Sequence, residues 1–265
     1  MRIQTASGLQ YRLAALVGAV TPVFWGIVMV TVFHVYYAYS ENSGAGVQAG
    51  LTLGQTVSYL WLVEVVQFIA GPFIVGDILA KIESGDVGIE LCRPLDIQLH
   101  WFMRNAGWRL GETTVKCAPI LAAALLMPAG YSLGPPASLA SLGAMLLAVA
   151  GSLCLSSALT TTYYLARLSV AWGDGAARIL FGMLPQVLSG AYVPLQFWPD
   201  FMQPFLRWQP FAGLLDLPLR LYVGALEPGG VWGVLLSQLV WTAGFLALGR
   251  LMLRRNLKRL VVQGG

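Results

Sequence analysis

The sequence KIESGDVGIELCRPLDIQLHWFMRNAGWR, from Lys81 to Arg109, sets the arrangement of the remaining residues. It gathers charged residues, glycine and proline, and it separates two long apolar segments of the chain. Such a composition is typical of a solvated link and not of a membrane span. We interpret this stretch, called the connector below, as a cytosolic link between two spans and not as a catalytic site.

The composition of the whole chain indicates an integral membrane protein. Hydrophobic residues make up 57% of the sequence and charged residues 11%, and the mean hydropathy is +0.69, which is unusual for a soluble domain. One membrane crossing needs about 20 apolar residues. The 265 residues therefore have room for about six spans with short loops and no separate soluble domain. The three cysteines, Cys92, Cys117 and Cys154, lack the spacing of metal ligands, and we expect free thiols.

The apolar segments predict an all-α integral membrane protein whose residues 1–265 form a single transmembrane domain. Six spans are expected at residues 13–39, 51–80, 112–128, 139–165, 179–193 and 231–253. The pair Gly71-Pro72 is expected to kink the second span. The fourth span is rich in Gly, Ala and Ser, which favours close packing against other helices.

The segment from Pro194 to Gly230 reads neither as a span nor as an ordinary loop. It contains six prolines among many aromatic residues. The aromatic residues Trp198, Phe201, Phe205 and Trp208 recur at steps of three and four, which predicts that they share one helical face. Because backbone at membrane depth must satisfy its own hydrogen bonds, we expect short re-entrant half-helices that dip into the outer leaflet.

The basic residues indicate the orientation of the six expected spans. Of the 16 Lys and Arg residues, all but Arg207 and Arg220 fall on one side of the membrane in this arrangement. Basic residues gather on the cytosolic side of membrane proteins. Both termini are therefore expected in the cytosol.

Catalytic chemistry is scarce in this sequence. The only histidines are His34 and His100, and neither a metal-binding pattern nor a phosphate-binding glycine-rich loop occurs. We therefore expect no catalytic residue, no metal site and no cofactor bound by this chain.

Glu64 is the one acidic residue deep inside an expected span, and two interpretations of it remain open. In the first, it forms a polar point of a transport route with Gln67, bordered by Trp61 and Phe68. In the second, it is a protonated or hydrogen-bonded glutamate that ties helices together.

Two motifs carry a resemblance to a known family. The sequence ESGDVGIELCRPL, from Glu83 to Leu95, resembles the E-x-G-x-x-x-x-L-x-x-P-L stretch that follows the second span of ABC-2 type permeases. It is most similar to a bacterial branch with the pattern I-x-S-G-x-x-x-x-x-L-x-R-P-L, here Ile82 to Leu95, although Asp86 stands where many members have Thr. The second motif lies between the fifth and sixth spans and comprises Leu188-Ser189-Gly190, Pro194, Trp198-Pro199, Gln209-Pro210-Phe211, Pro218 and Gly224.

The resemblance implies that two permease subunits pair around a central route and that a separate cytosolic ABC ATPase, which binds ATP and Mg, docks beneath each. The segment from Glu83 to Leu95 would form a coupling helix seated in a groove of the ATPase. Ser84 or Asp86 could cap this helix, and Arg93-Pro94 would end it. The expected ATPase-coupling residues are Glu83, Ser84, Gly85, Asp86, Glu90, Leu91, Arg93 and Pro94.

The resemblance also suggests where the substrate passes. Spans one, two and five would line the translocation route, for which the expected residues are Trp61, Glu64, Gln67 and Phe68. An outer gate would be formed by Ser189, Gly190, Pro194, Trp198, Phe201 and Phe205.

The expected function is that of the membrane subunit of an ABC exporter in a bacterial plasma membrane, moving a hydrophobic or amphipathic substrate. Its expected partners are the ATPase, a second copy or a related permease, and membrane lipid, but no nucleic acid. Two alternatives stay open: a membrane enzyme acting on lipid through His100 or Glu64, and a scaffold without transport activity. The sequence does not name a substrate.

Overall fold

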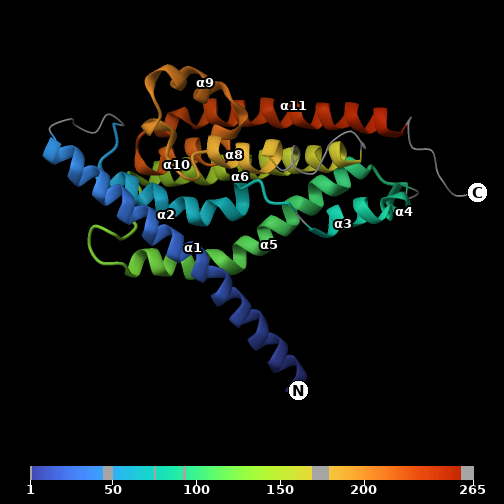
Figure 1. Cartoon of the computed structure of the whole chain (residues 1–265), viewed down its shortest axis with the longest axis horizontal. Helices are drawn as coiled ribbons and strands as arrows, with labels where there is room; N and C mark the ends of the chain where they lie inside the picture. Colours follow the sequence, from blue (N-terminus) through green and yellow to red (C-terminus); the bar gives the residue numbers. More distant parts are fainter. Residues whose placement is uncertain (1, 44–49, 75, 92–93, 169–178, 258–265) are drawn as a thin grey trace, which may run out of the picture.

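The chain folds into a bundle of helices, of which the computed structural model describes residues 2–43, 50–74, 76–91, 94–168 and 179–257 (Figure 1). These residues form helices and no strand, which confirms the all-α prediction for the described part of the chain. The α-helices are α1 (Arg2–Ser43), α2 (Leu53–Ala70), α3 (Gly76–Ser84), α4 (Val87–Leu91), α5 (Ile97–Leu126), α6 (Leu139–Arg167), α8 (Leu184–Leu188), α9 (Gln203–Trp208), α10 (Asp216–Val223) and α11 (Val231–Leu257).

Four helices are long and apolar enough to cross a membrane. They cover Val20–Asn42, Leu53–Ala70, Leu139–Arg167 and Pro228–Arg255. Two shorter apolar helices, Lys116–Leu126 and Ile179–Leu188, lie where the third and fifth spans are expected. The described helices thus establish four candidate spans, and the count of six remains a prediction.

α6 forms the centre of the bundle. It packs against α11, α10, α5 and α2, and α11 runs beside it along its length (Figure 1). Its inward side carries small and hydroxyl residues such as Ser152, Ser156 and Thr160, all buried. The expected burial of the fourth span is therefore confirmed, and the small side chains let neighbouring backbones approach closely.

The second span differs from its prediction because the expected kink is a complete break. α2 ends at Ala70, and Gly71 adopts an extended conformation with φ −63° and ψ 150°. Pro72 follows, has no amide hydrogen and cannot continue a helical ladder. A new helix, α3, begins at Gly76, so residues 71–80 do not extend α2.

The connector is shorter than the sequence suggests. α5 begins at Ile97, where the Asp96 carboxylate caps the helix by accepting a hydrogen bond of 3.1 Å from the Leu99 amide. It then continues to Leu126 without interruption. The second half of the expected connector, up to Arg109, is therefore part of the helix that carries the third span.

Figure 1 places the connector and the short helices toward opposite ends of the bundle. α3 and α4 lie at the end where α11 finishes, and α9 and α10 lie toward the other end. Short 3₁₀ turns at Leu195–Phe197, Asp200–Met202 and Pro210–Gly213 connect the pieces around α9. The expectation of short half-helices between the fifth and sixth spans agrees with these elements, whereas their depth in a membrane stays a prediction.

Candidate functional site

A cavity of about 390 Å³ lies between α1, α2 and the residues around α8. Three of the four expected route residues, Glu64, Gln67 and Phe68, line it from α2. Trp61 does not line it. Its indole packs against Gly26 of α1, and its Nε1 donates a hydrogen bond of 2.7 Å to the Tyr131 carbonyl.

Glu64 lies in the wall of this cavity and is only 4% exposed. Its Oε2 accepts a hydrogen bond of 2.8 Å from Gln67 Nε2. Within the described ranges of the chain, no Lys, Arg or His forms an ion pair with it. Both hydrogen-bonded residues belong to α2, so this contact does not tie α2 to another helix.

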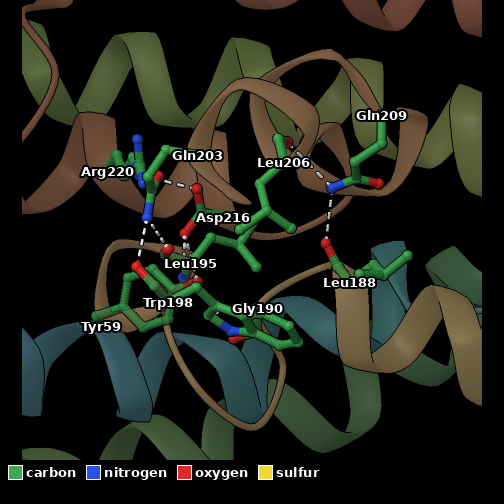
Figure 2. A network of polar contacts seen from close by, with 10 residues as sticks. All are labelled: Tyr59, Leu188, Gly190, Leu195, Trp198, Gln203, Leu206, Gln209, Asp216 and Arg220. Carbon is green, nitrogen blue, oxygen red and sulfur yellow. Dashed lines mark hydrogen bonds and ion pairs between the residues drawn. The ribbon is translucent and has the colours of Figure 1, made fainter. Parts of the chain in front are cut away.

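A buried carboxylate organises the region between α8 and α10, as Figure 2 shows. Asp216, at the start of α10, is 1% exposed. Its Oδ1 accepts hydrogen bonds from Tyr59 Oη at 3.1 Å and from the Leu195 amide at 3.2 Å. Its Oδ2 lies 2.8 Å from Arg220 Nε, and its amide donates to the Ser189 carbonyl at 3.0 Å. The carboxylate thus joins α2, α10 and the turn that begins at Leu195, and the Asp216 amide adds the end of α8.

Gly190 closes this network and cannot carry a side chain. Its φ of +83° lies in the left-handed region, which strongly favours glycine. Its carbonyl oxygen lies 3.2 Å from the Tyr59 hydroxyl. A Cβ at position 190 would stand 2.5 Å from that hydroxyl and 3.3 Å from Asp216 Cβ. The glycine of the second motif is therefore required by backbone conformation and by packing.

Two glutamines satisfy backbone carbonyls in the same region (Figure 2). Gln203 Nε2 donates to the Leu195 carbonyl at 2.8 Å and to the Trp198 carbonyl at 2.9 Å. Gln209 Nε2 donates to the Leu188 carbonyl at 2.8 Å. Irregular backbone at membrane depth needs such partners because lipid supplies none. The short helices are thus fixed by side chains and not only by apolar packing.

The expected gate residues separate into two groups. Ser189, Gly190 and Pro194 are buried and belong to the Asp216 network or its borders. Phe201 and Phe205 are exposed, at 83% and 57%, on the helical turns from Asp200 to Trp208. Trp198 was expected on the same helical face, but that prediction is wrong because it precedes these turns and packs beside Leu195 and Leu206.

The break after α2 is closed by the guanidinium of Arg109, which is fully buried in α5. Arg109 Nη1 donates to the Gly71 carbonyl and, at 3.5 Å, to that of Ile69. Its Nη2 donates to the Phe73 carbonyl at 3.2 Å and to Thr160 Oγ1 on α6 at 2.9 Å. One side chain thereby binds the carbonyl groups that the end of α2 leaves without helical partners.

The expected coupling helix consists of two helices, because Gly85, with φ +83°, forms a turn between α3 and α4. Ser84 Oγ donates a hydrogen bond of 2.8 Å to Asp86 Oδ2, so these two side chains bond each other inside the turn. Ser84, Gly85, Asp86 and Pro94 are exposed. Arg93 and the side chain of Leu91 lie outside the described residues.

Glu90 was expected to pair with a partner protein, but it is held inside the chain. Its Oε1 lies 2.6 Å from Lys81 Nζ, and its Oε2 accepts a hydrogen bond of 2.9 Å from Trp101 Nε1. Burial alone would raise the pKa of the Glu90 carboxyl, but these two hydrogen bonds and the charges of Lys81 and Arg104 lower it below its usual value. Glu90 therefore fixes α4 to α3 and α5.

Glu83 makes a second attachment, since its Oε1 lies 3.5 Å from Arg167 at the end of α6. Apolar packing adds to these ion pairs, because Ile78 and Val87 lie in one buried cluster with Trp101 and Tyr164. In contrast, Ile89 is 65% exposed and does not belong to this cluster. The α3–α4 segment, Gly76–Leu91, is thus firmly seated on one side and presents an apolar side chain on the other.

Comparison with known protein families identifies the chain. Residues 18–264 match the family described as ABC-2 family transporter protein. The chain belongs to this family. No curated protein and no solved structure matches it. The family membership confirms the resemblance drawn from the two motifs and makes this chain a multi-pass membrane protein of a transporter family.

The residues that hold this ABC-2 protein together were largely missed by sequence reasoning. Asp216, Tyr59 and Arg109 were not singled out, and the hydrogen bonds of Glu90 to Lys81 and Trp101 were not predicted. The position of Asp216 within a proline-rich, aromatic segment could have drawn attention to it, since an acid in apolar surroundings requires polar partners. No local signal links Tyr59 to it, because 157 residues separate the two in the sequence.

Proposed function

We propose that this ABC-2 family member is the membrane-spanning permease subunit of an ABC exporter, driven by a separate cytosolic ATPase that binds ATP and Mg. The observation that carries the proposal is the α3–α4 segment. Its inner side is fixed to α5 and α6 by Glu90 and Glu83, and its outer side exposes Ile89 at 65% and leaves Asp86 and Ser84 in solvent. A rigid element with one exposed apolar anchor and a polar rim suits a protein interface.

The proposed topology has six spans, with both termini and the α3–α4 segment in the cytosol of a bacterium. The four long apolar helices and the two shorter ones support this arrangement. The distribution of Lys and Arg supports the orientation. The short helices around α9 and α10 would then lie at the outer face, where they are proposed to form the outer gate.

The proposed mechanism is a population shift between an inward-facing and an outward-facing arrangement. ATP binding would draw two ATPase subunits together and move the α3–α4 segment as a unit. Because this segment is fixed to α5 and α6 by Glu90 and Glu83, its movement would carry these two helices with it, and Arg109 would pass the movement on to the end of α2. The route would run past Glu64, Gln67 and Phe68.

A second permease subunit is proposed to complete this route. The cavity is lined by α1, α2 and residues near α8, and Trp25 of α1 lines it while remaining 41% exposed. The neighbouring Phe24 is 63% exposed. These apolar side chains leave one side of the cavity open to a second copy or a related permease, with lipid covering the rest of the spans.

Co-purification from native membranes tests this function. A tagged chain, solubilised gently or transferred to nanodiscs, is expected to bring down a cytosolic ATPase in stoichiometric amount. A second, related permease in the same sample would indicate a heterodimer, and its absence a homodimer. Failure to recover an ATPase in several detergents and in nanodiscs would count against the transporter assignment and favour a lipid enzyme or a scaffold.

Ile89→Glu is expected to lower the amount of co-purifying ATPase about tenfold or more, which corresponds to about 1.4 kcal/mol of binding free energy. The added charge would lie where the exposed isoleucine is proposed to enter an apolar groove. The measurement is the ratio of ATPase to permease in a quantitative pull-down, together with a check that the variant elutes as a monodisperse peak.

Leu99→Glu provides the matched control, because Leu99 is 60% exposed and lies on a face of α5 different from that of Trp101, which contacts α4. The control is expected to keep the ATPase ratio of the unmodified chain. Equal losses for both variants, or no loss for Ile89→Glu, would contradict the docking role of Ile89.

A further inference from the structure

We propose that the cavity between α1 and α2 binds the cationic group of an amphipathic substrate, with the Glu64 carboxylate as its counter-charge. The inference rests on the proposed function, because it treats the cavity as a section of the transport route. It adds the chemical class of the cargo: an organic cation with an apolar or aromatic body. The argument depends on charge, on aromatic lining and on size.

Among the described residues that line the cavity, Glu64 supplies the only carboxyl group, and none of them is a Lys, Arg or His. It is 4% exposed and accepts its hydrogen bond from a neutral amide, Gln67. A carboxylate removed from water is costly unless a positive charge lies close to it. The cavity therefore offers an ionised Glu64 a place for a cation that the protein itself does not provide.

A basic side chain beside the cavity, that of Lys116, is paired with an acid. Lys116 of α5 lies with its Nζ 5.0 Å from the ring centroid of Phe68, which lines the cavity. The same ammonium group forms an ion pair with Glu112 one turn earlier in α5. Counting Glu64, Glu112 and Lys116 together leaves one net negative charge, which favours a cation over an anion.

Aromatic side chains complete the site. Trp25, Phe68, Phe73 and Tyr192 line the cavity together with Glu64. The faces of aromatic rings attract ammonium groups, and quaternary ammonium ions are recognised in this way because they cannot donate hydrogen bonds. Thr21 and Gln186 add neutral polar groups at the wall. This lining suits a soft organic cation better than a small hydrated metal ion, which prefers several oxygen ligands.

The size of the cavity agrees with such a ligand. Its volume of about 390 Å³ lies within the range of roughly 300–1,000 Å³ that small-molecule sites occupy. One aryl ring and one ammonium head can fit at the same time. An amphipathic cation could therefore place its charge at Glu64 and its ring among the aromatic residues.

The test is a binding experiment on the full chain in lipid nanodiscs without any ATPase. Radiolabelled benzyltrimethylammonium serves as the probe, and two unlabelled competitors of nearly identical shape are compared: benzyltrimethylammonium itself and its uncharged carbon analogue, neopentylbenzene. The expected result is saturable probe binding that the cation displaces at concentrations at least tenfold lower than the neutral compound requires.

Two variants assign the effect to Glu64. Glu64→Gln keeps the shape of the side chain, removes its charge and is expected to weaken probe binding at least tenfold. Glu227→Gln removes the same charge from an exposed position before α11 and is expected to bind the probe like the unmodified chain. Equal competition by the two compounds, or unchanged binding in Glu64→Gln, would overturn the inference.

The outcome can be separated from that of the proposed function. Recovery of an ATPase together with a failure to bind the probe would overturn the cation site and leave the permease assignment intact. Saturable binding that depends on Glu64 without any ATPase partner would support the cation site and count against the exporter assignment.

Discussion

Gly190→Ala is expected to reduce the yield of correctly folded protein sharply and to destabilise what remains by about 2–5 kcal/mol, the sum of a left-handed backbone cost and an overpacking cost. The backbone term arises because residue 190 has a φ of +83°. The packing term arises because the new Cβ would stand 2.5 Å from the Tyr59 hydroxyl.

The damage would extend beyond the glycine itself. To avoid the new methyl group, Tyr59 must move away from Asp216, whose Oδ1 accepts its hydrogen bond at 3.1 Å. Asp216 is almost fully buried and also holds the Leu195 amide and Arg220. A buried charged group that loses a partner costs more free energy than the hydrogen bond contributed.

Gly85→Ala separates the cost of the backbone conformation from the cost of overpacking. Gly85 has the same φ of +83°, but a Cβ there would meet no atom within 4 Å. Thermal unfolding followed by size-exclusion chromatography is expected to show a small loss for Gly85→Ala and a much larger one for Gly190→Ala. Equal losses would mean that the contact with Tyr59 contributes nothing.

Replacing Arg109 is the second change with a large expected effect. Arg109→Met is expected to lower the stability markedly, because each buried acceptor that is left without a donor costs about 1–3 kcal/mol. The guanidinium is the hydrogen-bond donor to the carbonyls of Ile69, Gly71 and Phe73 and to Thr160. Of these acceptors, the Gly71 carbonyl keeps two other donors, Ser156 Oγ at 2.9 Å and the Phe73 amide at 2.8 Å. Thr160 still donates to the Ser156 carbonyl, so the loss falls mainly on the carbonyls of Ile69 and Phe73.

Arg109→Lys and Arg254→Gln are the matched comparisons for this prediction. Lysine keeps the charge but lacks the planar guanidinium group, which reaches several acceptors at once. Arg109→Lys is therefore expected to lower the stability nearly as much as Arg109→Met. Arg254 is exposed near the end of α11, and its replacement is expected to change the melting temperature little. A melting temperature for Arg109→Met within one or two degrees of the unmodified chain would contradict the role of Arg109.

The sequence located the sites of backbone change better than their form. The disturbance expected at Gly71-Pro72 is present, whereas Gly85, expected inside one coupling helix, has a positive φ and divides it into α3 and α4. Such positions can be located in a sequence because glycine permits unusual backbone conformations and proline restricts them wherever they occur. The regions they mark were therefore located correctly.

Contacts between distant residues were not predictable in the same way. Arg109 was assigned to a solvated connector because a charge normally requires water. In the structure it is buried, since the carbonyl of Gly71, 38 residues away, supplies an acceptor in place of water. Glu90 resembled an interface charge for the same reason, yet Lys81 and Trp101 satisfy it within the chain. A sequence pattern shows which groups need partners but not which partners they find.

Photochemical cross-linking at position 89 tests the central proposal most directly. A benzophenone amino acid is incorporated in place of Ile89 in the full chain, native membranes are irradiated, and the cross-linked proteins are identified by mass spectrometry, with the same reagent at position 99 as the control. The account predicts a specific product with an ATP-binding cassette protein from position 89 and none from position 99. Products with lipid alone, or with proteins that lack a nucleotide-binding domain, would contradict the assignment of this chain as the permease subunit of an ABC exporter.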